Sequence, residues 1–305
     1  MSKLHCKISW LKGLLAGLAA ASGVGYLATA YTVSRWLTRS SRGRPHPTPD
    51  VLGLDWGPLE CRTCDGLLLK GWVVAPPAPR ATLALFHGLR QNRAQALDRI
   101  ALLVRAGYRC VAFDHRAHGE SGGRRTSFGF REARDVAAVL DLVADRWPHQ
   151  GRVALGISMG AAALCFAASR ARELDAVILE SLYHDLGSTF QNRIGSKFPA
   201  WFGRFRRGVI WVTERRLGLR LRQIAPVDHI SELAPAPVLL LTGAEDPHAP
   251  PHDAARLFAR CCGPREIALI PGADHANLVQ AGGRLYRNLL LGFLDRRLAC
   301  ARAAA

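Results

Sequence analysis

Residues 151–171 read GRVALGISMGAAALCFAASRA and join a short apolar run to a segment of small residues. The run from Arg152 to Gly156 predicts a strand, and the small residues after Gly160 predict a helix. Ser158 stands on the turn between them, with a glycine two residues to either side. Glycines at these positions allow a sharp turn and close packing of the helix against the strand. The stretch therefore predicts a nucleophilic serine beside the positive end of a helix dipole.

The composition indicates a folded globular protein with room for one large domain or two small ones. The chain has 305 residues, of which 49% are hydrophobic. Its net charge is +17, and the excess is nearly all arginine spread along the chain. Specific nucleic-acid binding is therefore not expected, whereas a basic surface facing anionic lipid fits this charge.

The first 44 residues differ from the rest of the chain. Residues 13–33 form a run of 21 residues without a charge, which is long enough to cross a bilayer as a helix. Basic residues lie on both sides of the run, so neither membrane orientation is favoured. We predict a single-pass membrane anchor over residues 1–44. A secretory signal with a cleavage site at 28–30 is the alternative. Residues 45–57, rich in proline, are expected to be a linker.

Eight strand-like runs and five helical patterns follow the linker. The later runs are continuous and apolar, and amphipathic helices separate them, which is typical of a mostly parallel sheet covered on both faces. We therefore predict an α/β domain over residues 58–300, with an eight-stranded sheet that an antiparallel hairpin begins. The predicted strands are 59–64, 67–74, 81–86, 110–114, 152–156, 176–180, 237–242 and 266–270. The predicted helices are 92–106, 128–146, 159–172, 252–262 and 277–299.

One connection is longer than a parallel sheet requires. About 55 residues separate Glu180 from Pro237, and those from Phe190 to Pro226 include nine Lys or Arg and a single acid, Glu214. One interpretation is a helical excursion with a solvated, charged face. The other is a short helical cap, about 183–230, over the active site. In that case the following side chains would face substrate or lipid: Trp201, Phe202, Phe205, Ile210 and Trp211.

A serine nucleophile needs a base, and the base needs an acid that orients it. His275 follows one apolar strand in ALIPGADHANLV, and Asp246 follows another in LLLTGAEDPHAP. Both lie at the carboxyl ends of parallel strands, where ligands bind in open sheets. The order Ser158, Asp246, His275 is that of the nucleophile-elbow enzymes. Asp274 and Glu180 are weaker candidates for the acid.

The remaining histidines and cysteines carry less information. His87 is expected to shape a loop, and His115 and His118 to pack or form hydrogen bonds. The single Cys61-x-x-Cys64 motif has no second pair at a suitable distance, so packing cysteines are favoured over zinc ligands. No spacing suggests a metal site and no glycine-rich loop suggests a nucleotide, so we expect neither a metal nor a cofactor.

Residues 58–299 resemble the α/β-hydrolase superfamily. Besides the motifs above, FHGLRQNR (Phe86–Arg93) is similar to the oxyanion-hole loop of that superfamily, and DHRAHGESGG (Asp114–Gly123) to its D-x-R-G-H-G-x-S loop. The second loop departs from the pattern because Ala117 stands where the family usually has glycine. The resemblance extends to small serine hydrolases of the esterase, lipase and acyl-peptidase kind, including membrane-anchored members with a short cap.

The resemblance implies a role for each candidate. Ser158 would be the nucleophile, His275 the general base and acid, and Asp246 the group that orients the histidine. The backbone N–H groups of Leu89 and Met159 would form the oxyanion hole. We expect hydrolysis of a small-molecule or lipid carboxylic ester, or a thioester, through an acyl-enzyme. A peptidase acting on short peptides and a non-catalytic, membrane-anchored binding module are the alternatives.

Overall fold

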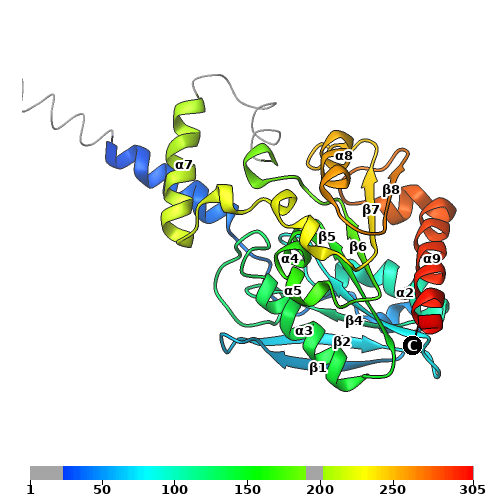
Figure 1. Ribbon diagram of the computed structural model, residues 1–305. Coiled ribbons are helices and arrows are strands. Elements are labelled where there is room, and N and C mark those ends of the chain that lie inside the picture. Colours follow the sequence, from blue (N-terminus) through cyan, green and yellow to red (C-terminus); the bar gives the residue numbers. More distant parts are fainter. Residues whose placement is uncertain (1–22, 190–201, 305) are drawn as a thin grey trace, which may run out of the picture. The chain divides into compact units, whose positions relative to one another are not determined.

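The computed structural model of the chain describes residues 23–189 and 202–304 (Figure 1). Two compact units are present: Met1–Arg39 with Lys197–Leu221, and Ser40–Ser196 with Arg222–Ala305. Residues 13–22 of the predicted membrane span and Trp201 of the predicted cap lie outside the described residues.

The second unit contains one eight-stranded sheet, in the order β1-β2-β4-β3-β5-β6-β7-β8. The first three strands of that order pair antiparallel, and every other neighbouring pair is parallel. The predicted mostly parallel sheet with an antiparallel hairpin is therefore confirmed. The strands are β1 (Trp56–Arg62), β2 (Leu68–Val74), β3 (Ala81–Phe86), β4 (Arg109–Phe113), β5 (Gly151–Ile157), β6 (Ala176–Glu180), β7 (Val238–Gly243) and β8 (Arg265–Ile270).

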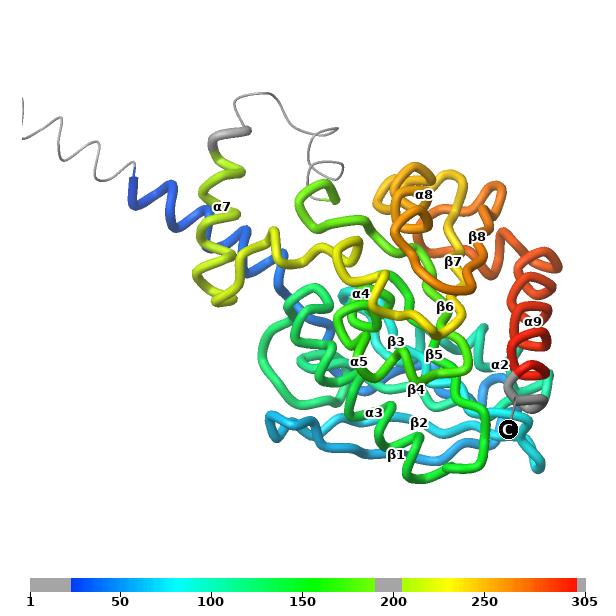
Figure 2. The backbone as a smooth tube through the Cα atoms, viewed as in Figure 1, coloured from blue at the N-terminus to red at the C-terminus, as the bar shows by residue number. Residues whose placement is uncertain are grey.

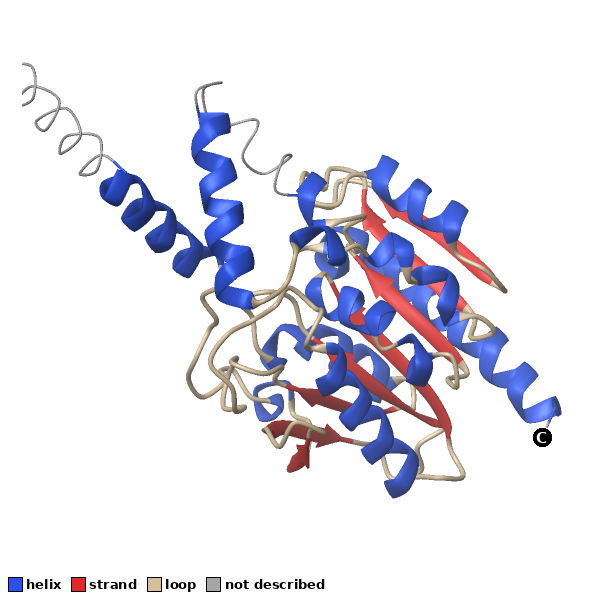
Figure 3. Cartoon of the chain, turned by 60° about the vertical axis from the view of Figure 1, so that its left-hand side comes forward, coloured by secondary structure: helices blue, strands red, loops and turns tan. Residues whose placement is uncertain are grey.

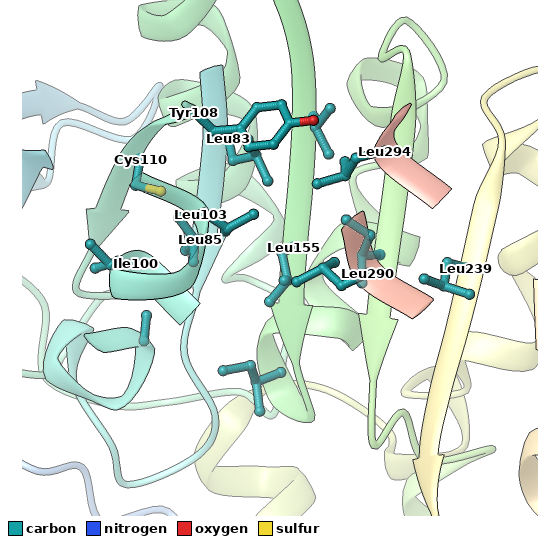
Figure 4. Packing of buried hydrophobic residues seen from close by; sticks show 14 of the residues in the cluster. Leu83, Leu85, Ile100, Leu103, Tyr108, Cys110, Leu155, Leu239, Leu290 and Leu294 are labelled. Atoms are coloured by element: carbon teal, nitrogen blue, oxygen red, sulfur yellow. The ribbon is translucent and has the colours of Figure 1, made fainter. Parts of the chain in front are cut away.

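Helices cover both faces of the sheet (Figure 3). One face carries α2 (Leu97–Arg105) and α9 (Leu278–Ala304), which contact each other. The other face carries α3 (Ala133–Arg146), α4 (Met159–Phe166), α5 (Ala168–Ala171) and α8 (Pro251–Arg260). Leucines of both helices on the first face pack against strand leucines, and each fully buried one stabilises the fold by about 2 kcal/mol. Figure 4 shows this core, with Leu103, Leu290 and Leu294 against Leu83, Leu85 and Leu155.

The predicted helix over 128–146 begins only at Ala133, so its first five residues were assigned wrongly. Phe128 and Gly129 have φ values of 57° and 103°, outside the right-handed helical region. The buried carboxylate of Glu132 holds this loop, since it accepts hydrogen bonds from the N–H groups of Ser127 and Gly129 at 2.9 and 3.0 Å. The apolar spacing predicted the helix correctly from Ala133 onwards. Its first turn is absent because the Glu132 carboxylate binds the N–H groups of the loop before it.

Within the second unit, residues 41–43, which precede the predicted linker, form hydrogen bonds with the loop that follows β4. Gly119 donates its N–H to Ser41 O at 2.7 Å, and Gly43 donates to Gly119 O at 3.2 Å. Arg42 donates to the carbonyl oxygens of Ser121 and Gly123. This segment therefore adds a short parallel bridge to the loop that follows β4.

The long connection between β6 and β7 is helical in its described part (Figure 2). A helical turn at 186–189 follows β6, and α7 (Phe202–Leu217) is its longest element. Three short 3-10 turns then lead to β7: Leu221–Gln223, Pro226–Asp228 and Ile230–Leu233. A helical excursion was predicted here, and its role as a cap stays a prediction.

The first unit is a pair of helices, α7 and a helix over residues 23–37. Ala30 is fully buried between them, together with Val209 and Val212. Farther along, Thr213 Oγ1 lies 2.9 Å from Ser34 Oγ. Across the described part of the chain, no helix combines the length and apolar character needed to cross a membrane. The membrane span therefore stays a prediction.

Candidate active site

Ser158 occupies a strained turn between β5 and α4. Its φ and ψ are 52° and −106°, and its N–H donates to Glu180 O at 2.8 Å. The flanking glycines are sterically required. A Cβ on Gly156 would lie 2.6 Å from Ala161 Cα, and one on Gly160 would overlap the carbonyl group of Phe86. The backbone thus holds the serine at the carboxyl end of β5, where its half-buried side chain can be reached.

The three candidate side chains form a hydrogen-bonded row. His275 Nε2 lies 2.9 Å from Ser158 Oγ, and His275 Nδ1 lies 2.7 Å from Asp246 Oδ2. Since a carboxylate only accepts, the ring proton sits on Nδ1 and Nε2 is left to accept from the serine hydroxyl. Asp246 is fully buried, while His275 is 25% exposed. Asp246 Oδ1 accepts from the N–H groups of His248 and Ala249 at 2.8 and 2.9 Å, which fixes the carboxylate.

The loops that carry the acid and the histidine are bonded directly to each other. Ala244 donates its N–H to Ile270 O at 3.0 Å, and Glu245 donates to Ala273 O at 2.9 Å. A Cβ on Gly243 would lie 2.7 Å from Asp274 O, so only glycine permits this approach. The two loops therefore hold Asp246 and His275 in a fixed position relative to each other.

The loop after β3 runs beside the serine. A Cβ on Gly88 would lie 3.6 Å from Ser158 Cβ, and the Gly88 N–H donates to Gln95 Oε1 at 2.7 Å. Within the described residues, the N–H groups of Leu89 and Met159 donate to no protein acceptor. An oxyanion hole requires free N–H donors beside the nucleophile, and Leu89 and Met159 stay the predicted donors.

The ring of His87 holds this loop from inside the protein. His87 Nε2 accepts from His115 N–H at 3.0 Å, so its proton sits on Nδ1 and is donated to Gly88 O at 2.7 Å. Burial holds the pKa of His87 well below its usual value of about 6.5, and the neighbouring His115 and His118 lower it further. The ring is therefore neutral and structural, as expected.

The loop after β4 is held by buried ion pairs. Asp114 pairs with Arg93, and Arg116 pairs with Asp135 at 2.8 Å and with Asp65 at 2.8 Å. Ala117, which stands where the family usually has glycine, has a φ of 65° and donates its N–H to Gly122 O at 2.6 Å. The turn forms without the glycine and keeps its left-handed conformation.

The weaker candidates for the acid have other partners. Glu180 is buried and accepts from Arg99 and Tyr286, and Asp274 accepts from the N–H groups of Ala276 and Asn277. Two residues near His275 were not predicted. Ser181 has a φ of 48° and its hydroxyl donates to His275 O at 3.3 Å, and the ring of His248 meets the ring of His275 edge-on at 5.2 Å.

Metal-ligand geometry is not found in the described part of the chain, where no three His, Cys, Asp or Glu side chains are placed to share an ion. His118 accepts from Arg90 N–H and its Nδ1 lies 2.9 Å from Arg116 O. Cys61 and Cys64 are free thiols, and burial raises the pKa of Cys61 to about 12. His118 therefore takes part in hydrogen bonds of the loop after β4.

Comparisons with known proteins agree with this architecture. Residues 77–209 match the family described as serine aminopeptidase, S33. YqkD of Bacillus subtilis, an uncharacterized protein, is 28% identical over 235 residues, which cover 75% of this chain and 76% of YqkD. The α/β hydrolase domain-containing protein WAV2 of Arabidopsis thaliana is 24% identical over 82% of each chain.

Among solved structures, esterase Pf2001 of Pyrococcus furiosus is similar with a TM-score of 0.72 and 23% identity, covering 85% of this chain and 97% of the esterase. At this level of identity, the similarity to the esterase shows a shared fold. Hydrolysis is the class of activity that the family match supports. The chain has the α/β-hydrolase fold, and residues 77–209 are similar to a hydrolase family of that fold.

Proposed function

We propose that the chain is a serine hydrolase that cleaves carboxylic esters through an acyl-enzyme on Ser158. The observation that carries the proposal is the position of His275, whose two ring nitrogens lie 2.9 Å from Ser158 Oγ and 2.7 Å from Asp246 Oδ2. A hydroxyl becomes a competent nucleophile when a positioned base removes its proton, and a buried carboxylate stabilises the imidazolium that results.

The reaction would proceed in two steps. Ser158 Oγ attacks the ester carbonyl carbon while His275 Nε2 takes the hydroxyl proton, and the N–H groups of Leu89 and Met159 stabilise the oxyanion. His275 then returns the proton to the leaving alcohol, and the acyl group stays on Ser158. A water molecule, activated by the same imidazole, hydrolyses the acyl-enzyme and restores the free serine.

The apolar and basic composition of 190–225 supports an acyl chain or a lipid ester as substrate. Hydrolysis of p-nitrophenyl esters would test this preference. We expect kcat/KM to rise as the acyl chain lengthens beyond acetate, because more apolar surface is buried in the transition state. A flat or falling series would contradict a long-chain substrate.

A peptidase is the second candidate, favoured by the description of the matching family as a serine aminopeptidase. It would use the same row of side chains on an amide bond. A panel of aminoacyl and dipeptidyl p-nitroanilides separates the two functions, since an esterase should leave these amides nearly untouched.

The third candidate is a non-catalytic binding module that keeps the fold. Substituting Ser158→Ala and His275→Ala tests catalysis directly. We expect each to abolish ester turnover while circular dichroism shows an unchanged fold, because each removes a group that the chemistry requires. Full activity in Ser158→Ala would contradict the proposed chemistry, and inactivity of the native chain towards both esters and amides would favour the binding module.

A further inference from the structure

The helix pair of the first unit carries most of the exposed apolar side chains in the described part of the chain. Nine large hydrophobic side chains are exposed there, and six of them belong to this pair. Isolated exposed hydrophobic residues are ordinary, but a concentration of them marks an interaction surface. The six are Val24, Tyr26, Leu27, Tyr31, Trp36 and Trp211, with exposed fractions of 38–68%.

Along the helix over 23–37, the exposed apolar residues form a stripe. Val24, Leu27 and Tyr31 follow each other at spacings of three and four, and Arg35 continues the same stripe one turn later. Trp36 is also exposed, but its position lies about 140° around the helix from Tyr31 and outside this stripe. Aromatic and basic side chains next to an apolar stripe are typical of helices at the headgroup region of a bilayer.

The same two segments are strongly basic. Residues 23–39 and 202–221 contain eight arginines and one acid, Glu214. Two of these arginines stack on aromatic rings, Arg215 on Trp211 at 5.3 Å and Arg216 on Tyr31 at 5.1 Å. A surface that combines cations with exposed aromatic rings fits a layer of anionic headgroups over an acyl boundary.

The pairing of the two helices also bears on how they would meet a membrane. Tyr26 packs against Phe205 with ring centroids 5.7 Å apart, and a Cβ on Gly208 would lie 2.6 Å from Tyr26 Cζ. Arg206 and Arg207 are therefore level with Tyr26, near the middle of the predicted 13–33 span. Each arginine at the centre of a bilayer costs several kcal/mol. If residues 13–33 crossed the bilayer while the helix over 23–37 stayed paired with α7, Arg206 and Arg207 would lie in the hydrocarbon core.

From these observations we propose that the helix pair of 23–37 and α7 is a peripheral docking surface for anionic phospholipid bilayers. It lies in the headgroup region, with Val24, Leu27 and Tyr31 inserted and the arginines against lipid phosphates. The pair replaces a transmembrane span as the means of attachment. The inference is independent of the proposed hydrolysis, because it concerns binding and not turnover.

Vesicle cosedimentation of the full chain tests the lipid preference. Vesicles of phosphatidylcholine alone are compared with vesicles in which about a third of the lipid is phosphatidylserine. We expect strong binding only to the second kind, and weaker binding in high salt because the charges are screened. Equal binding to both kinds, or binding to neither, would overturn the proposal.

Two variants and a matched control locate the surface. The triple variant R35Q, R207Q and R215Q should weaken binding on the order of a hundredfold, at roughly fivefold for each cation near an anionic surface. Val24→Ser with Leu27→Ser should weaken it about tenfold through lost apolar burial. The control R260Q, R284Q and R287Q makes the same charge change at exposed arginines of the second unit and should bind as the native chain does. Equal losses in the control and the triple variant would overturn the assignment to the helix pair.

Alkaline carbonate extraction separates a peripheral from a spanning protein. Carbonate should release the full chain from membranes of the cells that express it, since charge and shallow insertion hold it there. Retention of the full chain in the membrane pellet would show a spanning anchor and overturn the peripheral mode.

Discussion

At Ser158, a positive φ of 52° is kept in a residue that carries a Cβ, and this strain persists because the surrounding backbone fixes it. Two contacts hold the turn: the N–H of Ser158 on Glu180 O, and the close packing of Gly160 under the Phe86 carbonyl group. The position of Ser158 is thus set by the absence of a side chain at Gly160 and by the hydrogen bond to the carbonyl oxygen of Glu180 at the end of β6.

Gly160→Ala tests this support. The added methyl group would overlap the carbonyl of Phe86 and push α4 away from the loop that carries Leu89. We expect a loss of about a hundredfold in kcat, since a displacement near 1 Å misaligns the nucleophile, and a stability loss of about 1–3 kcal/mol. Ester hydrolysis and urea unfolding measure the two effects. Gly57→Ala, whose Cβ would meet only an ordinary 3.5 Å contact, is the control, and equal effects in both would contradict the argument.

The buried, neutral His87 predicts how stability depends on pH. Its folded pKa is far below its unfolded pKa of about 6.5, so between these values only the unfolded chain binds a proton. Stability contributed by the neutral ring is therefore present above pH 6.5 and is lost as the pH falls, by up to about 1.4 kcal/mol per pH unit. His118 adds in the same direction, because burial also lowers its pKa.

Urea unfolding at a series of pH values between about 7.5 and 5 measures this slope. His87→Gln should reduce the slope by close to the contribution of one proton, about 1.4 kcal/mol per pH unit. If this variant does not fold, His118→Gln provides the same test. His149→Gln, at an exposed position, is the matched control for the histidine-to-glutamine change itself. A wild-type free energy of unfolding that stays constant or rises on acidification, with no difference between the variants, would contradict a neutral His87.

At the scale of the elements, a buried ion pair ties two helices to the back of the nucleophile turn. Glu180 ends β6, its carbonyl holds the Ser158 N–H, and its carboxylate accepts from Arg99 Nε of α2 at 2.9 Å and from Tyr286 of α9. Burial and the nearby carboxylate raise the pKa of Tyr286 well above its usual value, so the phenol remains a donor.

Glu180→Gln should lower the free energy of unfolding by about 3–5 kcal/mol, because it leaves the Arg99 guanidinium buried without a counter-charge. Asp141→Asn is a matched control, since it breaks an ion pair with Arg170 in which both side chains are 49% exposed. That control should cost less than about 1 kcal/mol. Comparable losses from the two variants in urea unfolding would contradict a structural role for the buried pair.

The contact between Tyr26 and Gly208 gives a further prediction for the helix pair. Gly208→Ala places a methyl group against the tyrosine ring and should separate the helices, which raises amide hydrogen exchange in 23–37 and in α7. Gly25→Ala meets nothing within 4 Å and should instead slow exchange, because alanine favours the helix by about 1 kcal/mol. Unchanged exchange in Gly208→Ala would contradict the packing of this pair.

The strands and most helices could be predicted because their apolar periodicity records which face is buried. The loop over Phe128–Glu132 could not, since its form depends on a carboxylate turning back onto the N–H groups of Ser127 and Gly129. Ser181 and His248 were missed for a related reason. Their approach to His275 depends on loops after β6, β7 and β8 meeting at close range, and no local pattern encodes such a meeting.

For the whole molecule, the order of residues along the chain predicted which strand ends would meet, but it did not predict how the helices of the first unit pair. Ser158, Asp246 and His275 each follow a strand, and the parallel sheet brings the ends of its strands to one edge. The apolar run over 13–33 predicted a span from hydropathy alone. The pairing of residues 23–37 with the arginine-rich α7 is a tertiary contact, which hydropathy does not contain.

Labelling with a fluorophosphonate tests whether Ser158 is activated, because this reagent reacts covalently with a serine that a neighbouring base activates. We predict a single adduct on Ser158, identified by peptide mass spectrometry of the folded full chain, and loss of the adduct in His275→Ala. Absence of labelling in the folded chain, or an adduct that persists unchanged in His275→Ala, would show that His275 does not activate Ser158.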